Sequence, residues 1–229
     1  MQNKIKEYFK ELQFDVQKHS YEVRGKSLTS VSKTISKYVE KVDFDKIAGF
    51  VAKKRGITKA EVLAEWNAKK VASCNQGTLV HTFGENYNGT QKPTNGFEEA
   101  IVKFWDNIPD YIQPFLFELQ MYSETLGIAG TADIILYNTL TKKFQILDYK
   151  TNEDLFKNYK GKTLLEPFNN LLDSPFNKYQ LQLSMYQLLF EQSGFEVESR
   201  RLIWLKPNGV YESFKTEDLT KPLLKELTK

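Results

Sequence analysis

The stretch GTADIILYNTLTKKFQILDYKTNEDL, from Gly130 to Leu155, decides the fold. Two runs rich in β-branched and apolar residues flank the polar tetrapeptide TLTK at 139–142, which predicts an antiparallel β-hairpin. A turn centred on that tetrapeptide places Asp133 opposite Asp148, with Cβ atoms about 4.5–5.5 Å apart. Lys150 lies two residues beyond Asp148, so it projects from the same face. The register therefore predicts two carboxylates and one ammonium at one end of a sheet face.

Two close carboxylates repel each other when both are ionised, and like charges in opposed positions destabilise a sheet. A divalent cation removes this conflict, and Mg²⁺ typically binds one or two carboxylates together with waters and phosphate oxygens. Lys150 would then orient or deprotonate an attacking water, or stabilise charge that develops on phosphorus. The alternative is structural: Asp148 and Lys150 sit at a solvent-exposed strand end, and Asp133 is an edge residue.

The other segments predict a mixed α/β fold in which a helical N-terminal part precedes the sheet. Apolar periodicity and turn residues mark helices first, then three strands, one helix and two more strands. Expected helices cover 1–20, 43–56, 58–85 with a possible break near Gly77, 95–108, 177–194 and 219–229. Ser and Thr residues in the stretch 27–41 offer caps before a further helix. Expected strands cover 114–125, 127–138, 143–151, 199–207 and 209–216. The segment 152–177 reads either as a lid or clamp or as a plain surface loop.

Composition places the chain among globular proteins. Of its 229 residues, 41% are hydrophobic and 27% charged. No apolar run reaches the roughly 18–20 residues of a membrane span, and the start lacks an apolar signal segment, so we expect a cytoplasmic protein without membrane contact. The single Cys74 excludes an internal disulfide and any four-cysteine metal or iron–sulfur site.

Charge is unevenly distributed along the chain. Residues 1–75 contain 16 Lys and Arg against 9 Asp and Glu, whereas the remainder contains 16 against 20. One reading is a solvated helical face; the other is a polyanion-binding arm beside a site that gathers carboxylates around a metal. Candidates for a phosphate track are Lys53, Lys54, Arg55, Lys69, Lys70, Lys157, Lys160 and Lys162.

Two expected helices carry further polar residues at helical spacing. His81 and Glu85 are four residues apart, as are Gln182 and Tyr186, so each pair lies on one helical face. His81 is either a metal ligand or a structural histidine. Gln182 and Tyr186 either cap a core or present an amide and a phenol to a site at the end of the sheet.

Taken together, the sequence resembles the PD-(D/E)XK nuclease superfamily, and within it the RecB-like and phage exonuclease branch. The similar motifs occur in the family's order over about residues 73–205. They are GTLVH ending at His81, GTAD ending at Asp133, LDYKT with Asp148 and Lys150, and QLSMY from Gln182 to Tyr186. The single cysteine excludes the members that carry an iron–sulfur cluster.

The resemblance implies a restriction-endonuclease-like core over 73–229, a central mixed sheet flanked by helices, after a basic helical region over 1–72. It implies cleavage of DNA phosphodiesters with Mg²⁺, for which Mn²⁺ substitutes. His81, Asp133, Asp148 and the backbone carbonyl of Tyr149 would be the metal ligands, and Lys150 the catalytic lysine. Gln182 and Tyr186 would contact DNA or brace the site. Glu118 and Glu124 lie near the site by chain order and receive no firm role.

We therefore expect a metal-dependent deoxyribonuclease, an exonuclease of phage or bacterial recombination or repair. DNA is the expected partner, with a single-strand annealing or other recombination protein as a second. One alternative is an endonuclease of the same fold, such as a restriction or junction-resolving enzyme. The other is a catalytically inactive DNA-binding or assembly module. The intact Asp133, Asp148 and Lys150 count against the inactive module.

Overall fold

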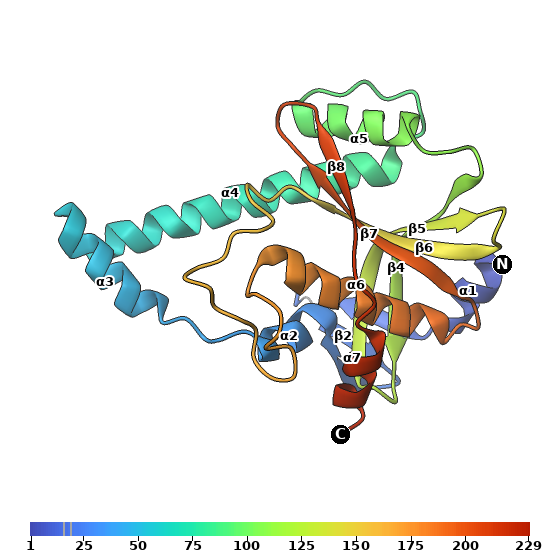
Figure 1. Cartoon of the computed structure of the whole chain (residues 1–229), viewed down its shortest axis with the longest axis horizontal. Helices are drawn as coiled ribbons and strands as arrows, with labels where there is room; N and C mark the ends of the chain where they lie inside the picture. The colour runs from blue at the N-terminus through green and yellow to red at the C-terminus, as the bar shows by residue number, and fades with distance from the viewer. Residues whose placement is uncertain (16, 19) are drawn as a thin grey trace.

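The computed structural model describes residues 1–15, 17, 18 and 20–229, in which a central mixed sheet is flanked by helices on both faces (Figure 1). The strands of the described part are β1 (Leu12–Asp15), β2 (Ser20–Val23), β3 (Lys26–Ser30), β4 (Ile112–Ser123), β5 (Ile128–Asn138), β6 (Lys143–Lys150), β7 (Val197–Leu205) and β8 (Tyr211–Lys215). The helices are α1 (Gln2–Tyr8), α2 (Val31–Ile35), α3 (Phe44–Arg55), α4 (Lys59–Asn86), α5 (Gly96–Asp106), α6 (Pro175–Glu191) and α7 (Thr220–Leu227), with a 3-10 turn η1 (Ser36–Tyr38).

The central hairpin has the predicted register. Strands β5 and β6 pair antiparallel around the turn at 139–142, with Ile135 opposite Ile146 and Ile134 opposite Leu147. Strand β4 pairs antiparallel with the other edge of β5, whereas β7 runs parallel to β6. The two central strands are buried on both faces, which explains why they are rich in isoleucine and leucine.

Two apolar cores lie on opposite faces of this sheet. On one face, Ile135 and Ile146 pack with residues of α2, α6 and α7. On the other, Ile134 and Leu147 pack with Val80 of α4 and with the apolar face of α5. Figure 1 shows α6 and α7 below the strands and α4 and α5 above them. Alternate residues of β5 and β6 therefore point to different helical layers.

The expectation of a helix over residues 1–20 is wrong beyond Tyr8. Only α1 is helical there; Ile5 and Phe9 are buried in the larger core, and β1, β2 and β3 follow as short strands. Strand β3 continues the sheet by pairing in parallel with the start of β5. The strands are four or five residues long and half exposed, so their periodicity was weak. Val16 and His19, which the expected helix included, lie outside the described residues.

A two-helix arm extends from the body, formed by α3 and the first part of α4, residues 43–66 (Figure 1). Asp43 caps the start of α3, and Gly56 ends this helix in the left-handed conformation, with φ of 67°. Thr58 and Glu61 form the predicted capping box of α4. Ala48, Ala52 and Val62 form a small core of their own, separate from the cores of the body.

Between the arm and the body, α4 runs through a bare stretch. Residues 67–75 are all exposed, and the helix continues without interruption past Gly77, where a break was expected. The boundary expected between residues 72 and 73 lies inside this helix. Within the described part of the chain, no helix is long and apolar enough to cross a membrane, the 28-residue α4 included.

Candidate metal centre

The candidate site lies where β5 and β6 separate. Their pairing ends at Ile134 and Leu147; beyond this point β5 stays with β4 and reaches β3, while β6 stays with β7. The backbone N–H of Tyr149 donates to Asp133 Oδ2 over 3.3 Å. The carbonyl of Tyr149 lies 3.0 Å from His81 Nε2. Side chains therefore satisfy the backbone groups that leave the ladder.

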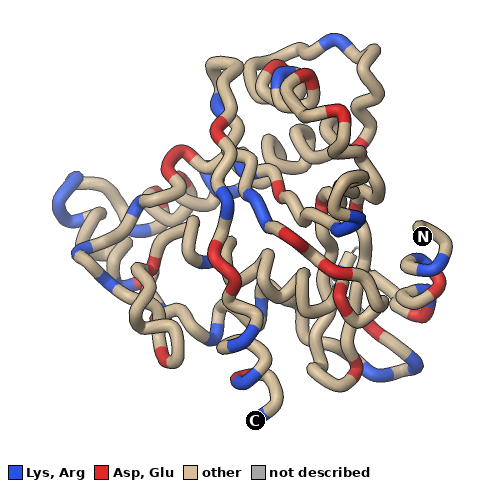
Figure 2. Tube along the Cα trace, turned by 45° about the vertical axis from the view of Figure 1, so that its right-hand side comes forward, with Lys and Arg blue, Asp and Glu red and all other residues tan. Residues whose placement is uncertain are grey.

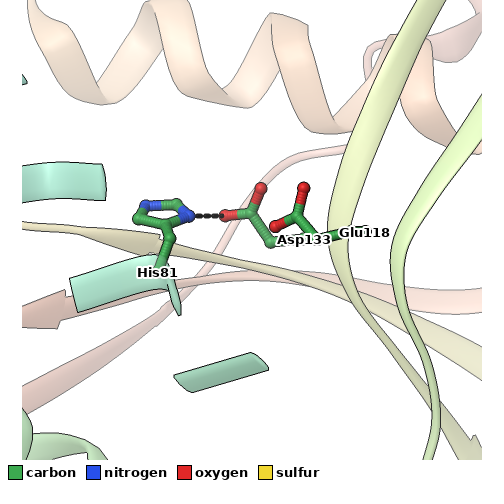
Figure 3. A group of neighbouring side chains, drawn as sticks. All are labelled: His81, Glu118 and Asp133. Atoms are coloured by element: carbon green, nitrogen blue, oxygen red, sulfur yellow. Dashed lines mark ion pairs between the residues drawn. The ribbon is translucent and has the colours of Figure 1, made fainter. Parts of the chain in front are cut away.

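Three carboxylates stand side by side on neighbouring strands at this fork. Glu118 lies between the pairs Phe117–Ile134 and Leu119–Ala132, so it faces Asp133, and the hairpin register extends the row to Asp148. Ligand atoms of His81, Glu118 and Asp133 all lie within 4.8 Å of one another. Figure 3 shows the imidazole and the two carboxylates converging, with His81 Nδ1 3.1 Å from Asp133 Oδ2.

Glu118 is a residue to which the sequence assigned no firm role. Its φ is +47°, a left-handed conformation that is uncommon for a residue with a side chain, and a register shift lies just before it, between Pro114 and Leu116. This irregularity sets the register that faces Glu118 toward Asp133. The alternation of β4 could have indicated a carboxylate on this face, but the shift in register could not be read from the sequence.

Asp148 belongs to a second group of contacts. Its Oδ2 forms an ion pair with Lys150, and its Oδ1 accepts a bond of 3.4 Å from Gln182 Nε2. Gln182 Nε2 also lies 2.9 Å from the hydroxyl oxygen of Tyr186. Lys150 Nζ lies over the ring of Tyr179, 4.4 Å from its centroid. The structure thus brings Asp148, Lys150, Gln182 and Tyr186 together, as predicted, while the compact three-residue ligand group contains Glu118 instead of Asp148.

Two glycines allow this close packing. A Cβ on Gly130, in the GTAD motif, would come within 2.7 Å of the ring of Tyr186. A Cβ on Gly84 of α4 would come within 2.5 Å of the buried ring of Tyr149. Both positions exclude a larger side chain because buried rings of the site occupy the space.

Electrostatics of the site reflect crowding of negative charge. Burial and the charge of Asp133 raise the pKa of Glu118 to about 7 and that of Asp148 to about 6. Burial also opposes ionisation of Asp133, but the hydrogen bond and charge of His81 and the charge of Lys150 together outweigh it, so the pKa of Asp133 is lowered. Burial lowers the pKa of His81, yet the hydrogen bond and charge of Asp133 prevail and raise it to about 9. The imidazolium therefore occupies a position among the carboxylates that suits a cation.

Lys150 remains charged although it is buried. Burial would lower its pKa, but the charges of Asp148 and Asp133 outweigh burial and raise the pKa above the ordinary value. This ammonium is therefore a fixed positive charge beside the row of carboxylates. It is not a proton acceptor near neutral pH.

Cavities open on two sides of the site. One of about 390 Å³ is lined by His81 and Lys150 together with Ser73 of the bare stretch. Another of about 230 Å³ is lined by Glu118 and Tyr186 together with Tyr21. A third, of about 730 Å³, adjoins the first and shares Ser73 and residues 151–153 with it.

The predicted basic residues lie on the arm, the bare stretch and the loop 151–174. Figure 2 shows Lys and Arg distributed over the chain trace, interspersed with Asp and Glu. Arg55 is engaged within the arm by a two-bond contact with Glu65, with N–O distances of 2.7 and 3.0 Å. Lys69 and Lys162 form exposed ion pairs with Glu153 and Glu40. Among the lysines predicted for the phosphate track, those without an ion pair in the described structure are Lys53, Lys54, Lys70, Lys157 and Lys160.

Two other acidic residues have minor places. Glu124 lies in the turn after β4, as expected, and faces Arg24 at 3.5 Å. Glu85, one turn beyond His81 on α4, is exposed and acts on the site through its charge on Glu118.

No protein-family model matches the chain, and no curated protein matches its sequence. A solved structure described as "Crystal structure of SSO0001" is 15% identical and covers 86% of this chain and 80% of its own, with a TM-score of 0.33. A similarity at that score carries no argument about this chain.

Proposed function

We propose that the chain is a metal-dependent deoxyribonuclease. The observation that carries the proposal is the row of carboxylates on three adjacent strands, Glu118, Asp133 and Asp148, bordered by the imidazole of His81 and the ammonium of Lys150. A sheet has no structural reason to oppose carboxylates, because like charges in such positions destabilise it.

The donor set fits a hard divalent cation. Burial and the charge of Asp133 raise the pKa values of Glu118 and Asp148, and a cation bound beside them would favour their ionised forms. Asp133, Glu118, His81 and the carbonyl of Tyr149 would hold Mg²⁺, with Mn²⁺ as substitute. Bound there, the ion would act as a Lewis acid and lower the pKa of a water molecule.

The chain's own residues have distinct roles in this proposal. Lys150 presents a permanent positive charge where charge develops on phosphorus, and Asp148 and Tyr179 hold its ammonium in place. Gln182 positions Asp148 through a hydrogen bond and is itself held by Tyr186. The cavity of about 390 Å³ beside His81 and Lys150 gives a substrate access to the reacting groups.

The test is cleavage of fluorescent DNA by the purified full chain with Mg²⁺, with Mn²⁺ and with chelator. Lys150→Ala and Asp148→Asn should each lower the rate at least about 100-fold, the scale of a lost electrostatic or proton-transfer contribution. Lys143→Ala is the matched control, because Lys143 lies at the far end of β6 and is exposed. Cleavage by Lys150→Ala and Asp148→Asn at the rate of the control would refute the assignment.

Exonuclease action is the form that the sequence resemblance favours, with a recombination protein as a further proposed partner. A digest of linear against covalently closed circular DNA separates this from the endonuclease alternative. An exonuclease should degrade linear DNA and leave closed circles intact. Cleavage of the closed circles would favour an endonuclease of the same fold. The inactive-module alternative predicts DNA binding with no cleavage of either substrate.

A further inference from the structure

The candidate metal centre is recessed below the molecular surface. The Asp148 side chain is 1% exposed, and those of Asp133 and Lys150 are 13% and 14% exposed. Access is through the cavity of about 390 Å³, between Ser73 and Cys74 of the bare stretch and Asn152 and Glu153 of the loop 151–174. A single strand is narrower and more flexible than a duplex, so its phosphates reach a recessed site more readily.

In the described structure, the Lys69–Glu153 ion pair contacts the bare stretch of α4, but no residue of this stretch is buried. Residues 67–75 are exposed all round the helix and are mostly small or polar, Ala68, Ala72 and Ser73 among them. A helix that is exposed on every side typically bridges two parts of a molecule through solvent. Small residues leave room for a ligand to approach its backbone, and Lys69 and Lys70 add positive charge.

Cavities lie along this stretch and meet beneath it. The cavity of about 390 Å³ and its neighbour of about 730 Å³ share Ser73 and residues 151–153. The larger one reaches Trp204 and Lys206 on β7 and beyond it. Together they form a path that passes under Ser73 to His81 and Lys150.

The loop 151–174 forms the facing side of this path. The Lys69–Glu153 ion pair of 3.6 Å links it to α4, and the Lys162–Glu40 pair of 2.6 Å links it to the segment before α3. Leu155, Leu164 and Phe168 are buried and anchor the loop in the body. Figure 1 shows the loop running below α4, between the arm and α6.

Exposed aromatic rings stand on this anchored loop. Phe156 is 48% exposed and Tyr159 is 66% exposed, and each is followed by a lysine, Lys157 and Lys160. Lys160 Nζ lies 5.2 Å from the centroid of the Tyr159 ring. Aromatic rings combined with lysines are the usual means of holding single-stranded DNA, because bases stack on the rings while the ammonium groups contact phosphates.

We propose that a single strand of DNA lies between the bare stretch of α4 and the loop 151–174, and that unpaired DNA is the form of substrate that reaches the metal centre. The inference rests on the proposed function and specifies its substrate class. The strand would enter by the path under Ser73. Tyr159, on the facing loop, would provide a ring on which a base stacks.

The test is binding, measured independently of cleavage. Fluorescence anisotropy with chelator present compares a labelled oligodeoxythymidine with a blunt duplex of the same length, both on the full chain. Single strands should bind at least about tenfold more tightly than the duplex. Ser73→Trp should weaken single-strand binding about tenfold by filling the path. Leu79→Trp, on an exposed position of the same helix beyond the bare stretch and outside both cavities, should change it less than about twofold. Matching thermal unfolding curves establish that both tryptophan variants fold.

Each result bears on one proposal. Equal affinity for both DNA forms, or equal effects of Ser73→Trp and Leu79→Trp, would overturn the single-strand path. Tyr159→Ala should weaken single-strand binding about tenfold while Tyr159→Phe retains it, because a ring is sufficient for stacking; equal loss in both would also count against the path. Selective single-strand binding without metal-dependent cleavage would support the path and refute the proposed nuclease activity.

Discussion

Asp133 contacts a side chain and a backbone group at the candidate metal centre. Its Oδ2 faces the imidazole of His81 and accepts from the backbone N–H of Tyr149, while His81 Nε2 lies against the carbonyl of Tyr149. When His81 is protonated, both of its ring nitrogens donate to oxygens. A metal ion that binds a ring nitrogen of His81 must therefore displace a proton that is hydrogen-bonded to Asp133 or to the carbonyl of Tyr149.

Proton release should accompany metal binding. The pKa of His81 is raised to about 9, so at pH 7 Mn²⁺ binding must expel its proton, and affinity should rise with pH until about 9. Calorimetric titrations in buffers of different ionisation enthalpy measure the released protons. His81→Gln should release about one proton fewer per ion at pH 7. The same release from both proteins would show that His81 does not bind the metal.

Stability without metal should fall as pH rises, because Glu118 has a raised pKa. In the folded chain it binds its proton up to pH about 7, against an ordinary pKa of 4.5, so its favourable contribution is complete below pH 4.5 and lost by about pH 7. Glu118→Gln should therefore raise the unfolding temperature at pH 8 by several degrees and change it little at pH 4. Calorimetric unfolding with chelator measures this.

The matched control is Asp154→Asn, an exposed carboxylate of the loop 151–174. It should have no comparable pH-dependent effect. Mg²⁺ or Mn²⁺ should stabilise the wild-type chain more at pH 8 than at pH 5, because ionised carboxylates and neutral imidazole bind metal. An unchanged unfolding temperature of Glu118→Gln at pH 8 would contradict the conclusion that burial and the charge of Asp133 disfavour ionised Glu118.

Among the elements, the register of the β5–β6 hairpin was predictable. Strand β4 was also predicted, but its register was not. The turn TLTK and the apolar alternation define one register, which places Asp133 and Asp148 together. Glu118 depends on the register shift before Leu116 and on a positive φ, which arise from tertiary packing rather than local propensity. The sequence also predicted that His81 lies on a helix. It could not show that β5 and β6 separate, so that His81 contacts Asp133 and the carbonyl of Tyr149.

Helix α4 contains a matched pair of glycines. Gly84→Ala should destabilise the fold by about 1–3 kcal/mol, because its Cβ would overlap the buried ring of Tyr149. Gly77→Ala should instead stabilise it by up to about 1 kcal/mol, since its nearest neighbour, Thr151 Oγ1, lies 4.0 Å away. Urea unfolding of both variants at one pH provides the comparison. Equal effects would mean that Tyr149 can move aside.

At the scale of the molecule, the sequence predicted the central sheet and its flanking helices better than the short N-terminal strands. The mixed sheet and its flanking helices follow from alternation and helical periodicity, whereas β1–β3 are too short and too exposed to produce a strong pattern. The three basic residues of the run Lys53–Arg55 also differ in their surroundings. Arg55 is engaged with Glu65 between α3 and α4, which leaves Lys53 and Lys54 as the exposed cations of that turn.

Binding of DNA to the arm has a quantitative signature in its salt dependence. If Lys53 and Lys54 contact phosphates, replacing both with Gln should lower the log–log salt slope of binding by about 0.7–0.9 per contact. Arg55→Gln should mainly loosen the arm, seen as faster hydrogen exchange in α3, because it breaks the contact with Glu65. A slope unchanged in the double variant would assign the lysines to a solvated face.

In the bare stretch of α4, the number of residues should matter more than their identity. Residues 67–75 are exposed in the described structure, so we expect related sequences to vary freely there except at Ser73, which lines the path. One inserted residue, however, would rotate the arm by about 100° relative to His81, because an α-helix has 3.6 residues per turn. Insertions and deletions that preserve the facing of arm and site should therefore come in blocks of about seven, close to two turns.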